Sequence, residues 1–290
     1  MDKEQIQSLL NNKVSSYMPE QAWDSTVSIV IAYNHNVYQF GSGVLFRIAD
    51  DHFVVTAGHV IKEAHKLNKT LGITSANESF IALHGEWICS SEGQYGTDND
   101  PFDVAVFNLS QLAVQRLVGK TFLCLNDIDF DLKSGNGVYT LFGYPAIWSE
   151  PSTGSSEKLQ LRPFQYTTIA FSRDTTSFKE YQERFHLLLE AQLENSTTEK
   201  GSQATFEDLK GSSVPFPKEL GGISGCSVWQ IGDLDVPIDD WGQNQPKIVA
   251  VQTGVYHTSQ AIKATKWIAV TTLIHGAFPK LRSAMDLWRP

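Results

Sequence analysis

The feature that most constrains the fold of this chain is a series of short β-rich runs separated by turn residues. Early separators are Asn34-His35-Asn36 and Asp50-Asp51. Because runs of this length joined by tight turns form hairpins, the pattern favours antiparallel sheets in a barrel or a sandwich. The predicted strands are 27–33, 37–40, 44–48, 53–56, 80–83, 86–89, 104–109, 122–125, 138–142, 167–171, 185–190, 227–230, 248–252 and 267–270.

Helical patterns flank the β-rich region at both ends. Apolar residues recur at near-helical spacing over 2–18, and a second pattern, interrupted at Pro279, runs over 272–288. Amphipathic spacing of this kind indicates helices that pack one face on the domain. We therefore expect an N-terminal helical extension over 1–22 and a C-terminal helix over 271–288.

Composition excludes several partners. The 23 Lys and Arg residues against 32 Asp and Glu give a net charge of -9, whereas nucleic-acid binding requires a basic surface. Cys89, Cys124 and Cys226 are too few and too scattered for a disulfide framework or a structural zinc site. The sequence shows neither a secretory signal nor a run of about 20 apolar residues that could span a membrane. We expect a cytoplasmic protein that binds no nucleic acid and no membrane.

The first of three motifs with candidate chemistry contains a histidine. His59 directly follows a predicted strand that ends in Thr56-Ala57-Gly58. Small residues allow the backbone to turn tightly and to present the imidazole at the rim of a sheet. An imidazole in that place is a candidate general base.

The second motif is an acid at the start of a strand. Asp103 precedes the alternating run 104–109. Two nearby acids, Asp98 and Asp100, are expected to be solvated loop residues. A weak calcium site is the alternative, although Asp-x-Asp alone lacks the remaining ligands of a calcium loop.

The third motif, Gly221-Gly222-Ile223-Ser224-Gly225, directly precedes a predicted strand. We expect Gly222 and Ser224 to turn their N–H groups toward one point, where a developing oxyanion would be stabilised by a few kcal/mol. Gly225 would let the loop pass close to the opposite sheet.

The order and spacing of the motifs resemble the trypsin-like serine peptidase family, over most of the chain. His59 and Asp103 are 44 positions apart, against about 45 in the chymotrypsin template, and Asp103 and Ser224 are 121 apart, against about 93. The surplus of about 28 residues falls in two polar stretches, 149–158 and 194–217, which we expect to be loops.

The resemblance implies an all-β, chymotrypsin-like fold of two six-stranded antiparallel β-barrels with a helix at each end. The peptidase domain would cover 23–290, with the first barrel over about 23–130 and the second over about 131–270. The Gly-Tyr-Pro segment 143–145 is similar to the segment that closes the first strand of the second barrel in bacterial and organellar members. A bacterial-type cytosolic member is therefore implied.

The resemblance also implies the activity of a serine endopeptidase. His59 would be the general base, Asp103 would orient its ring, and Ser224 would attack the peptide carbonyl to form an acyl-enzyme. The backbone N–H groups of Gly222 and Ser224 would form the oxyanion hole. Such chemistry needs a protein or peptide substrate and neither a cofactor nor a metal.

Substrate contacts are less clearly marked. Gln252, Thr253 and Gly254 resemble the segment whose backbone pairs with an extended peptide. Lys218 lies six residues before the nucleophile, where family members often form the floor of the specificity pocket. A cation there would favour an acidic side chain, with His257 as reinforcement; the alternative is a solvated loop lysine.

Two residues beside the nucleophile depart from or complicate the family pattern. Ile223 stands where secreted members carry an aspartate that pairs with a newly cleaved N-terminus. An apolar residue cannot hold that ammonium group, so we expect control by loop ordering, by a regulatory protein partner or not at all. Cys226 is expected to face the core, with a redox-sensing thiol as the alternative.

Other hydrolase classes fit the sequence poorly. An α/β-hydrolase needs Gly-x-Ser-x-Gly and the order Ser, acid, His, whereas this chain has Cys226 in the last motif position and the order His, Asp, Ser. His59 and His65 do not form the zinc motif His-Glu-x-x-His. The remaining alternative is a catalytically silent or latent trypsin-fold module that serves in binding or signalling.

Overall fold

The computed structural model describes most of the chain. The predicted helix over 2–18 and the residues Asp98 and Lys218 lie outside the described residues. Most of the predicted loops 149–158 and 194–217 also lie outside them. The described residues are 20–34, 36–75, 77, 79–91, 100–132, 137–151, 159–176, 178, 180–191, 205–207, 213–215, 221–237, 240–241 and 246–288.

The first of two antiparallel sheets has seven strands in the order β5-β4-β1-β2-β3-β7-β6. The hairpin between β2 and β3 turns through Ala49, whose φ of 51° is left-handed, and Asp50. That conformation suits the two-residue turns of twisted hairpins. The strands are β1 (Thr26–Tyr33), β2 (Asn36–Ile48), β3 (Asp51–Ala57), β4 (Thr70–Thr74), β5 (Phe80–Ala82), β6 (Trp87–Cys89) and β7 (Val104–Asn108).

The second sheet has six strands in the order β11-β8-β15-β16-β17-β12. Its strands are β8 (Gly137–Gly143), β11 (Phe164–Ile169), β12 (His186–Glu190), β15 (Ser227–Asp233), β16 (Lys247–Tyr256) and β17 (Ala261–Lys266). Two short pairs lie outside both sheets, β9 (Glu150–Pro151) with β10 (Leu159–Gln160) and β13 (Thr205–Glu207) with β14 (Ser213–Pro215).

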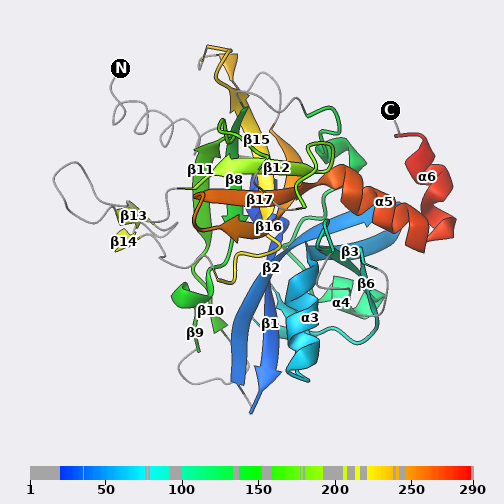
Figure 1. The fold of residues 1–290 in the computed structure, drawn as a ribbon. Coiled ribbons are helices and arrows are strands. Elements are labelled where there is room, and N and C mark those ends of the chain that lie inside the picture. Colours follow the sequence, from blue (N-terminus) through cyan, green and yellow to red (C-terminus); the bar gives the residue numbers. More distant parts are fainter. Residues whose placement is uncertain are drawn as a thin grey trace.

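Short helices connect and close the sheets. Helix α3 (Gly58–Lys66) follows β3 without a loop, and α5 (Trp267–Ala277) follows β17 in the same way. Figure 1 shows α5 and α6 at the C-terminal end, beside the first sheet. The remaining helices are α2 (Glu20–Asp24), α4 (Gln111–Gln115), η1 (Leu125–Asp127), η2 (Ala146–Trp148), η4 (Pro279–Leu281) and α6 (Arg282–Asp286).

One hydrophobic core joins the two sheets. Phe46 of the first sheet and Phe142 and Trp229 of the second are fully buried in the same cluster as Trp267 of α5. The rings of Phe46 and Trp267 lie 4.8 Å apart between centroids. Because large aromatic side chains dominate the energetics of burial, this cluster fixes the two sheets against each other. Residues at their junction are therefore held in place from both sides.

The predicted all-β fold of two curled antiparallel sheets with a C-terminal helix is confirmed, with seven strands rather than six in the first sheet. The predictions of strands over 122–125 and 267–270 are wrong. The first segment has only an isolated bridge at Leu123 before η1, and the second begins α5, so the last strand is β17. A short apolar run in a buried helix has the same pattern as a buried strand. No helix in the described part of the chain is long and apolar enough to cross a membrane.

Candidate active site

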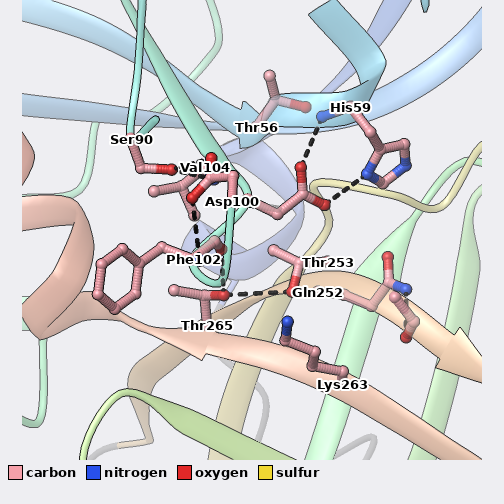
Figure 2. A network of polar contacts seen from close by, with 12 residues as sticks. Thr56, His59, Ser90, Asp100, Phe102, Val104, Gln252, Thr253, Lys263 and Thr265 are labelled. Carbon is pink, nitrogen blue, oxygen red and sulfur yellow. Dashed lines mark hydrogen bonds and ion pairs between the residues drawn. The ribbon is translucent and has the colours of Figure 1, made fainter. Parts of the chain in front are cut away.

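Antiparallel pairing of β3 and β7 brings the candidate base and acid together. In this pairing Ala57, the last residue of β3, lies opposite Val104, the first residue of β7. His59 follows the first strand and Asp103 precedes the second, so both leave the sheet at the same end. Nδ1 of His59 lies 2.6 Å from Oδ2 of Asp103, and the backbone N–H of His59 donates to Oδ1 at 2.7 Å (Figure 2).

The backbone around this pair is tightly packed. The N–H of Gly58 donates to the carbonyl oxygen of Asp103 at 2.7 Å. A Cβ on Gly58 would lie 3.0 Å from Oδ1 of Asp103, which leaves little room for a larger residue. Asp103 itself has a φ of 51°, a left-handed conformation that aspartate tolerates better than most residues.

The environment of His59 favours its protonated form. Burial lowers the pKa of His59, but the hydrogen bond and the negative charge of Asp103 outweigh this effect and raise the pKa above its ordinary value. The carboxylate accepts a hydrogen bond from the Nδ1–H group, so the lone pair of the neutral ring is on Nε2. That tautomer is the one a general base requires.

The second sheet holds the segment before Asp103. Nζ of Lys263 donates to the carbonyl of Pro101 at 2.9 Å. Oγ1 of Thr265 donates to the carbonyl of Phe102 at 2.6 Å (Figure 2). Nε2 of His186 also lies 2.8 Å from the Pro101 oxygen. Strands β12 and β17 therefore fix an acid that belongs to the first sheet.

His186 and Lys263 carried no functional signal in the sequence. Nδ1 of His186 accepts a hydrogen bond from the N–H of Gln182 at 2.9 Å, so Nε2 bears the proton donated to Pro101. Burial and the nearby charge of Lys263 lower the pKa of His186 to about 4. The ring is therefore neutral near pH 7. Only the contact between sheets reveals this role.

The prediction that Asp100 is a solvated loop acid is wrong. Its side chain is buried, and its Oδ2 accepts a hydrogen bond from Oγ of Ser90 at 2.6 Å. Its Oδ1 accepts from the N–H of Phe102 at 3.1 Å, while Oγ of Ser90 accepts from the N–H of Val104. An aspartate that bonds the backbone two residues later stabilises a turn, and this turn leads directly into Asp103.

The loop that carries Ser224 is anchored through its carbonyl groups. Four successive carbonyls accept hydrogen bonds from the protein interior. The bonds are Ala146 N to Gly221 O (2.8 Å), Ser42 Oγ to Gly222 O (2.9 Å), Cys226 N to Ile223 O (2.8 Å) and Ser42 N to Ser224 O (2.8 Å). The loop therefore has a single backbone path set by both sheets.

This path leaves two N–H groups available. In a trans peptide the N–H points opposite to the preceding carbonyl, so anchoring Gly221 O and Ile223 O turns the N–H groups of Gly222 and Ser224 away from their anchors. Neither N–H donates a hydrogen bond to a described residue. Gly222 has a φ of 90°, and a Cβ there would lie 2.5 Å from Ala146 N. Free, fixed donors of this kind are what an oxyanion hole requires.

Ser224 is packed beside the helix that carries His59. A Cβ on Gly41 would lie 2.8 Å from Cγ1 of Val60 and 3.3 Å from the carbonyl oxygen of Ser224, so glycine allows these elements to approach. Among the described residues the Ser224 hydroxyl makes no hydrogen bond to the His59 ring. Such bonds are often long in substrate-free enzymes and shorten when substrate binds.

The predicted substrate strand adjoins the same loop. The N–H of Gly225 donates to the carbonyl of Gln252 at 2.8 Å, and the N–H of Gln252 donates to the carbonyl of Cys226 at 2.9 Å. Among the described strands, β15 pairs with β16 only as far as Val251. Thr253 and Gly254 therefore continue β16 with one edge on β17 and the other edge unpaired by any described strand.

The two residues that complicate the family pattern are both buried. Ile223 and Cys226 are fully inaccessible in the core of the second sheet. The prediction that Cys226 faces the core is confirmed, and burial raises the pKa of its thiol far above the usual range. Burial also raises the pKa of Cys89 to about 11. Neither thiol has the thiolate character that oxidation requires.

His257 is exposed in the turn between β16 and β17, and Lys218 lies outside the described residues. The proposed acid-binding pocket therefore has no described geometry. In the part of the chain that the structure describes, no three His, Cys, Asp or Glu side chains gather as metal ligands would.

Two curled antiparallel sheets that meet at a His–Asp pair and a glycine-rich serine loop define a chymotrypsin-like fold. No family model and no curated protein sequence matches the chain. The solved structure of the scabies mite inactivated protease paralogue S-I1 is similar to it, with 13% identity, coverage of 91% of this chain and 98% of that chain, and a TM-score of 0.50.

Two further proteases are also similar in structure. The thermostable serine protease AL20 from an extremophilic microorganism shares 15% identity, covers 89% of this chain and 98% of its own, and gives a TM-score of 0.49. Protease Anisep from Arthrobacter nicotinovorans shares 16% identity, with 89% and 97% coverage and a TM-score of 0.49. Similarity at such identities shows the fold alone, and the fold is shared with an inactivated paralogue. Activity must be argued from the site.

Proposed function

We propose that the chain is a serine endopeptidase that hydrolyses peptide bonds through an acyl-enzyme. The observation that carries the proposal is the combination of a bonded His59–Asp103 pair with a Ser224 loop in which four successive carbonyls are anchored. A silent module has no need to keep two backbone donors free beside a base in the correct tautomer. These features support catalysis beyond what the fold implies.

The mechanism follows from the placement of the groups. Nε2 of His59 takes the proton from Oγ of Ser224 as that oxygen bonds to the peptide carbonyl carbon. The resulting oxyanion accepts hydrogen bonds from the N–H groups of Gly222 and Ser224. When the C–N bond breaks, His59 gives its proton to the departing amine, and water then releases the acyl group by the reverse sequence. Asp103 stabilises the imidazolium formed in both halves.

An extended peptide fits the open edge of β16. Thr253 and Gly254 continue the strand beyond the point where its pairing with β15 ends, so a substrate backbone can pair there as an added strand. Such pairing reads the main chain and leaves side chains to occupy pockets. The substrate class is therefore an unfolded or exposed segment of a protein.

A fluorophosphonate probe tests the proposal, because it reacts only with an activated serine. We expect the wild-type chain to be labelled and Ser224→Ala to be unlabelled, with hydrolysis of a peptide library falling at least about 10³-fold. The two proteins should unfold at the same denaturant concentration, since a triad residue contributes chemistry rather than packing.

Ser259→Ala is the matched control, because Ser259 lies in the turn between β16 and β17 and its exchange leaves the candidate site intact. This variant should be labelled like the wild type. A folded wild-type protein that is neither labelled nor active on the library would contradict the proposal and favour a silent binding module.

A further inference from the structure

Gln39 of β2 is a buried amide, 8% exposed, that reaches from the first sheet to the nucleophile loop. Its Nε2 lies 2.6 Å from the carbonyl oxygen of Gly41, 2.7 Å from that of Tyr144 and 3.3 Å from that of Gly222. Its Oε1 accepts a hydrogen bond from the hydroxyl of Ser28. Because three carbonyls can only accept, the amide has one possible orientation.

Ser42 completes this arrangement. Its Oγ donates to the carbonyl of Gly222 at 2.9 Å and accepts from the N–H of Tyr144 at 2.9 Å. Its backbone N–H binds the carbonyl of Ser224. The Gly222 carbonyl thus accepts a hydrogen bond from Ser42 and a longer, shared one from the Gln39 amide, whose two hydrogens serve three carbonyls. Both polar backbone groups of Tyr144 are bonded to the first sheet. We name Ser28, Gln39 and Ser42 the amide clamp.

The carbonyl of Gly222 belongs to the 222–223 peptide, which lies in the chain between the two peptides that carry the N–H groups of Gly222 and Ser224. Because Gly222 lacks a side chain and has wide backbone freedom, fixing this central peptide limits the rotation of both neighbours. A buried carbonyl without a donor is destabilising, so the amide clamp disfavours every rotation that removes Gly222 O from Gln39 and Ser42. No ion pair in the described part of the chain involves residues 221–225, and Ile223 is apolar and fully buried.

We infer that Gln39 is a positioning residue: it holds the Gly222 peptide in the conformation that presents the oxyanion donors, through neutral hydrogen bonds in place of an ion pair. The inference deepens the proposed function and rests on it. Since every partner of Gln39 belongs to the folded core, the donors are formed as soon as the two sheets pack. No cleavage of the chain is needed to order them.

The test replaces Gln39 with methionine, which has a similar length but cannot donate. We expect kcat of Gln39→Met to fall roughly 10- to 100-fold with KM within about threefold, because the loss is felt only when the oxyanion forms. The rate of phosphonylation should fall in parallel, since the phosphonyl oxygen occupies the same place. Ser28→Ala keeps the Gln39 amide and removes only the hydroxyl that bonds its Oε1, so kcat should fall less than in Gln39→Met.

Gln39→Glu separates positioning from packing. A protonated carboxyl group can donate to one carbonyl, whereas a carboxylate repels all three. The kcat of Gln39→Glu relative to wild type should therefore rise as the pH falls, and the ratio removes the titration of His59. A pH-independent ratio would overturn the inference.

Asn108→Leu is the matched control. It also exchanges a hydrogen-bonded amide for an apolar side chain, but Asn108 donates to Asp51 at the far end of β7. Its kcat should stay within about twofold of wild type. An equal fall of kcat in Asn108→Leu and Gln39→Met, or a Gln39→Met enzyme within threefold of wild type, would overturn the inference.

Amide hydrogen exchange tests the clamp without using activity. The N–H of Ser42 donates to the carbonyl of Ser224, and the N–H of Tyr144 donates to Oγ of Ser42. Both should exchange at least about tenfold faster in Gln39→Met than in the wild type, whereas their exchange rates should not change in Asn108→Leu. Unchanged exchange in Gln39→Met would overturn the inference even in an active enzyme. If exchange is faster in Gln39→Met but the fluorophosphonate probe does not label the wild type, the result contradicts the proposed function alone.

Discussion

At the scale of single residues, the electrostatics of the site are governed by one short contact. The carboxylate of Asp103 bonds both the ring and the backbone N–H of His59. Its charge raises the pKa of His59 despite the burial of the ring. A base with a raised pKa accepts protons more readily. It also stays protonated, and so cannot act as a base, up to a higher pH.

Replacing Asp103 by asparagine should expose both effects. Asp103→Asn removes the charge, so the pKa of His59 should fall and kcat should drop by about 10⁴, as the wrong tautomer is favoured. In the wild type, kcat/KM should decline as the pH falls through a midpoint above the ordinary imidazole value; in Asp103→Asn the midpoint of the residual activity should lie lower. NMR titration of His59 and pH–rate profiles measure the two quantities.

Asp51→Asn is the control for this experiment. Asp51 is likewise a bonded acid of the first sheet, held by Asn108 and Lys280, but it lies at the opposite end of β3. Its replacement should leave the midpoint unchanged. A common midpoint in Asp103→Asn and wild type would contradict the assignment of Asp103 as the partner of the base.

The proposed catalytic residues could be predicted from the sequence because small residues or strand starts lie beside them. His59, Asp103 and Ser224 stand beside glycines or at a strand start, and these local features follow from close backbone approach. Gln39 and His186 gave no such signal. Their roles depend on contacts across the junction of the sheets, which no local pattern contains.

At the scale of elements, the nucleophile loop is limited by steric contact with the first sheet. A Cβ on Gly225 would lie 2.1 Å from the carbonyl oxygen of Ser42 and 2.2 Å from Oγ1 of Thr56, and Gly225 has a φ of 90°. Both the contact and the conformation exclude a side chain. The expectation that Gly225 permits a close pass of the opposite sheet agrees with these distances.

Gly225→Ala should therefore destabilise the fold by about 2–4 kcal/mol and abolish labelling, since the loop must move to make room. Gly276→Ala is the matched substitution, because the added Cβ would have no atom within 4 Å beyond its chain neighbours and the backbone of its own helix, α5. It should stabilise the protein by up to about 1 kcal/mol. Urea unfolding measures both, and a Gly225→Ala protein as stable as wild type would refute the steric argument.

Some strands could be predicted from the sequence and others could not, because local patterns contain no contacts between the sheets. The strands of the first hairpins could be predicted because they are continuous β-rich, largely buried runs bounded by clear turn residues. The last strand, Ala261–Lys266, contains two buried or half-buried lysines and was missed, while the apolar start of α5 was taken for a strand. The buried Lys263 donates a hydrogen bond to the carbonyl of Pro101, a contact that forms only after the sheets pack.

At the scale of the whole molecule, the junction of the sheets is both a hydrophobic core and a set of polar contacts. His186, Lys263 and Thr265 of the second sheet bond the carbonyls of Pro101 and Phe102, which precede Asp103. Any change that weakens this junction should disturb the acid before it disturbs either sheet. Stability and catalytic geometry are therefore coupled through the 100–103 segment.

The pH dependence of stability tests this coupling through His186. Its pKa is about 4 when folded and near the ordinary 6.5 when unfolded, so the unfolded chain binds the proton more readily. By linkage, the contribution of His186 to the free energy of unfolding is complete above pH 6.5. It is lost as the pH falls toward 4, to an extent on the order of 3 kcal/mol. Urea unfolding at pH 7.5 and 4.5 should show this loss in the wild type.

His186→Gln should lose less stability over the same range, because glutamine can donate to Pro101 but does not titrate. His257→Gln, which changes an exposed histidine in the turn between β16 and β17, should behave like the wild type. Equal losses in His186→Gln and His257→Gln would show that the neutral, buried His186 is not what ties the second sheet to the acid. A smaller loss in His186→Gln alone would place the acid sensitivity of the fold at the contact that also positions Asp103.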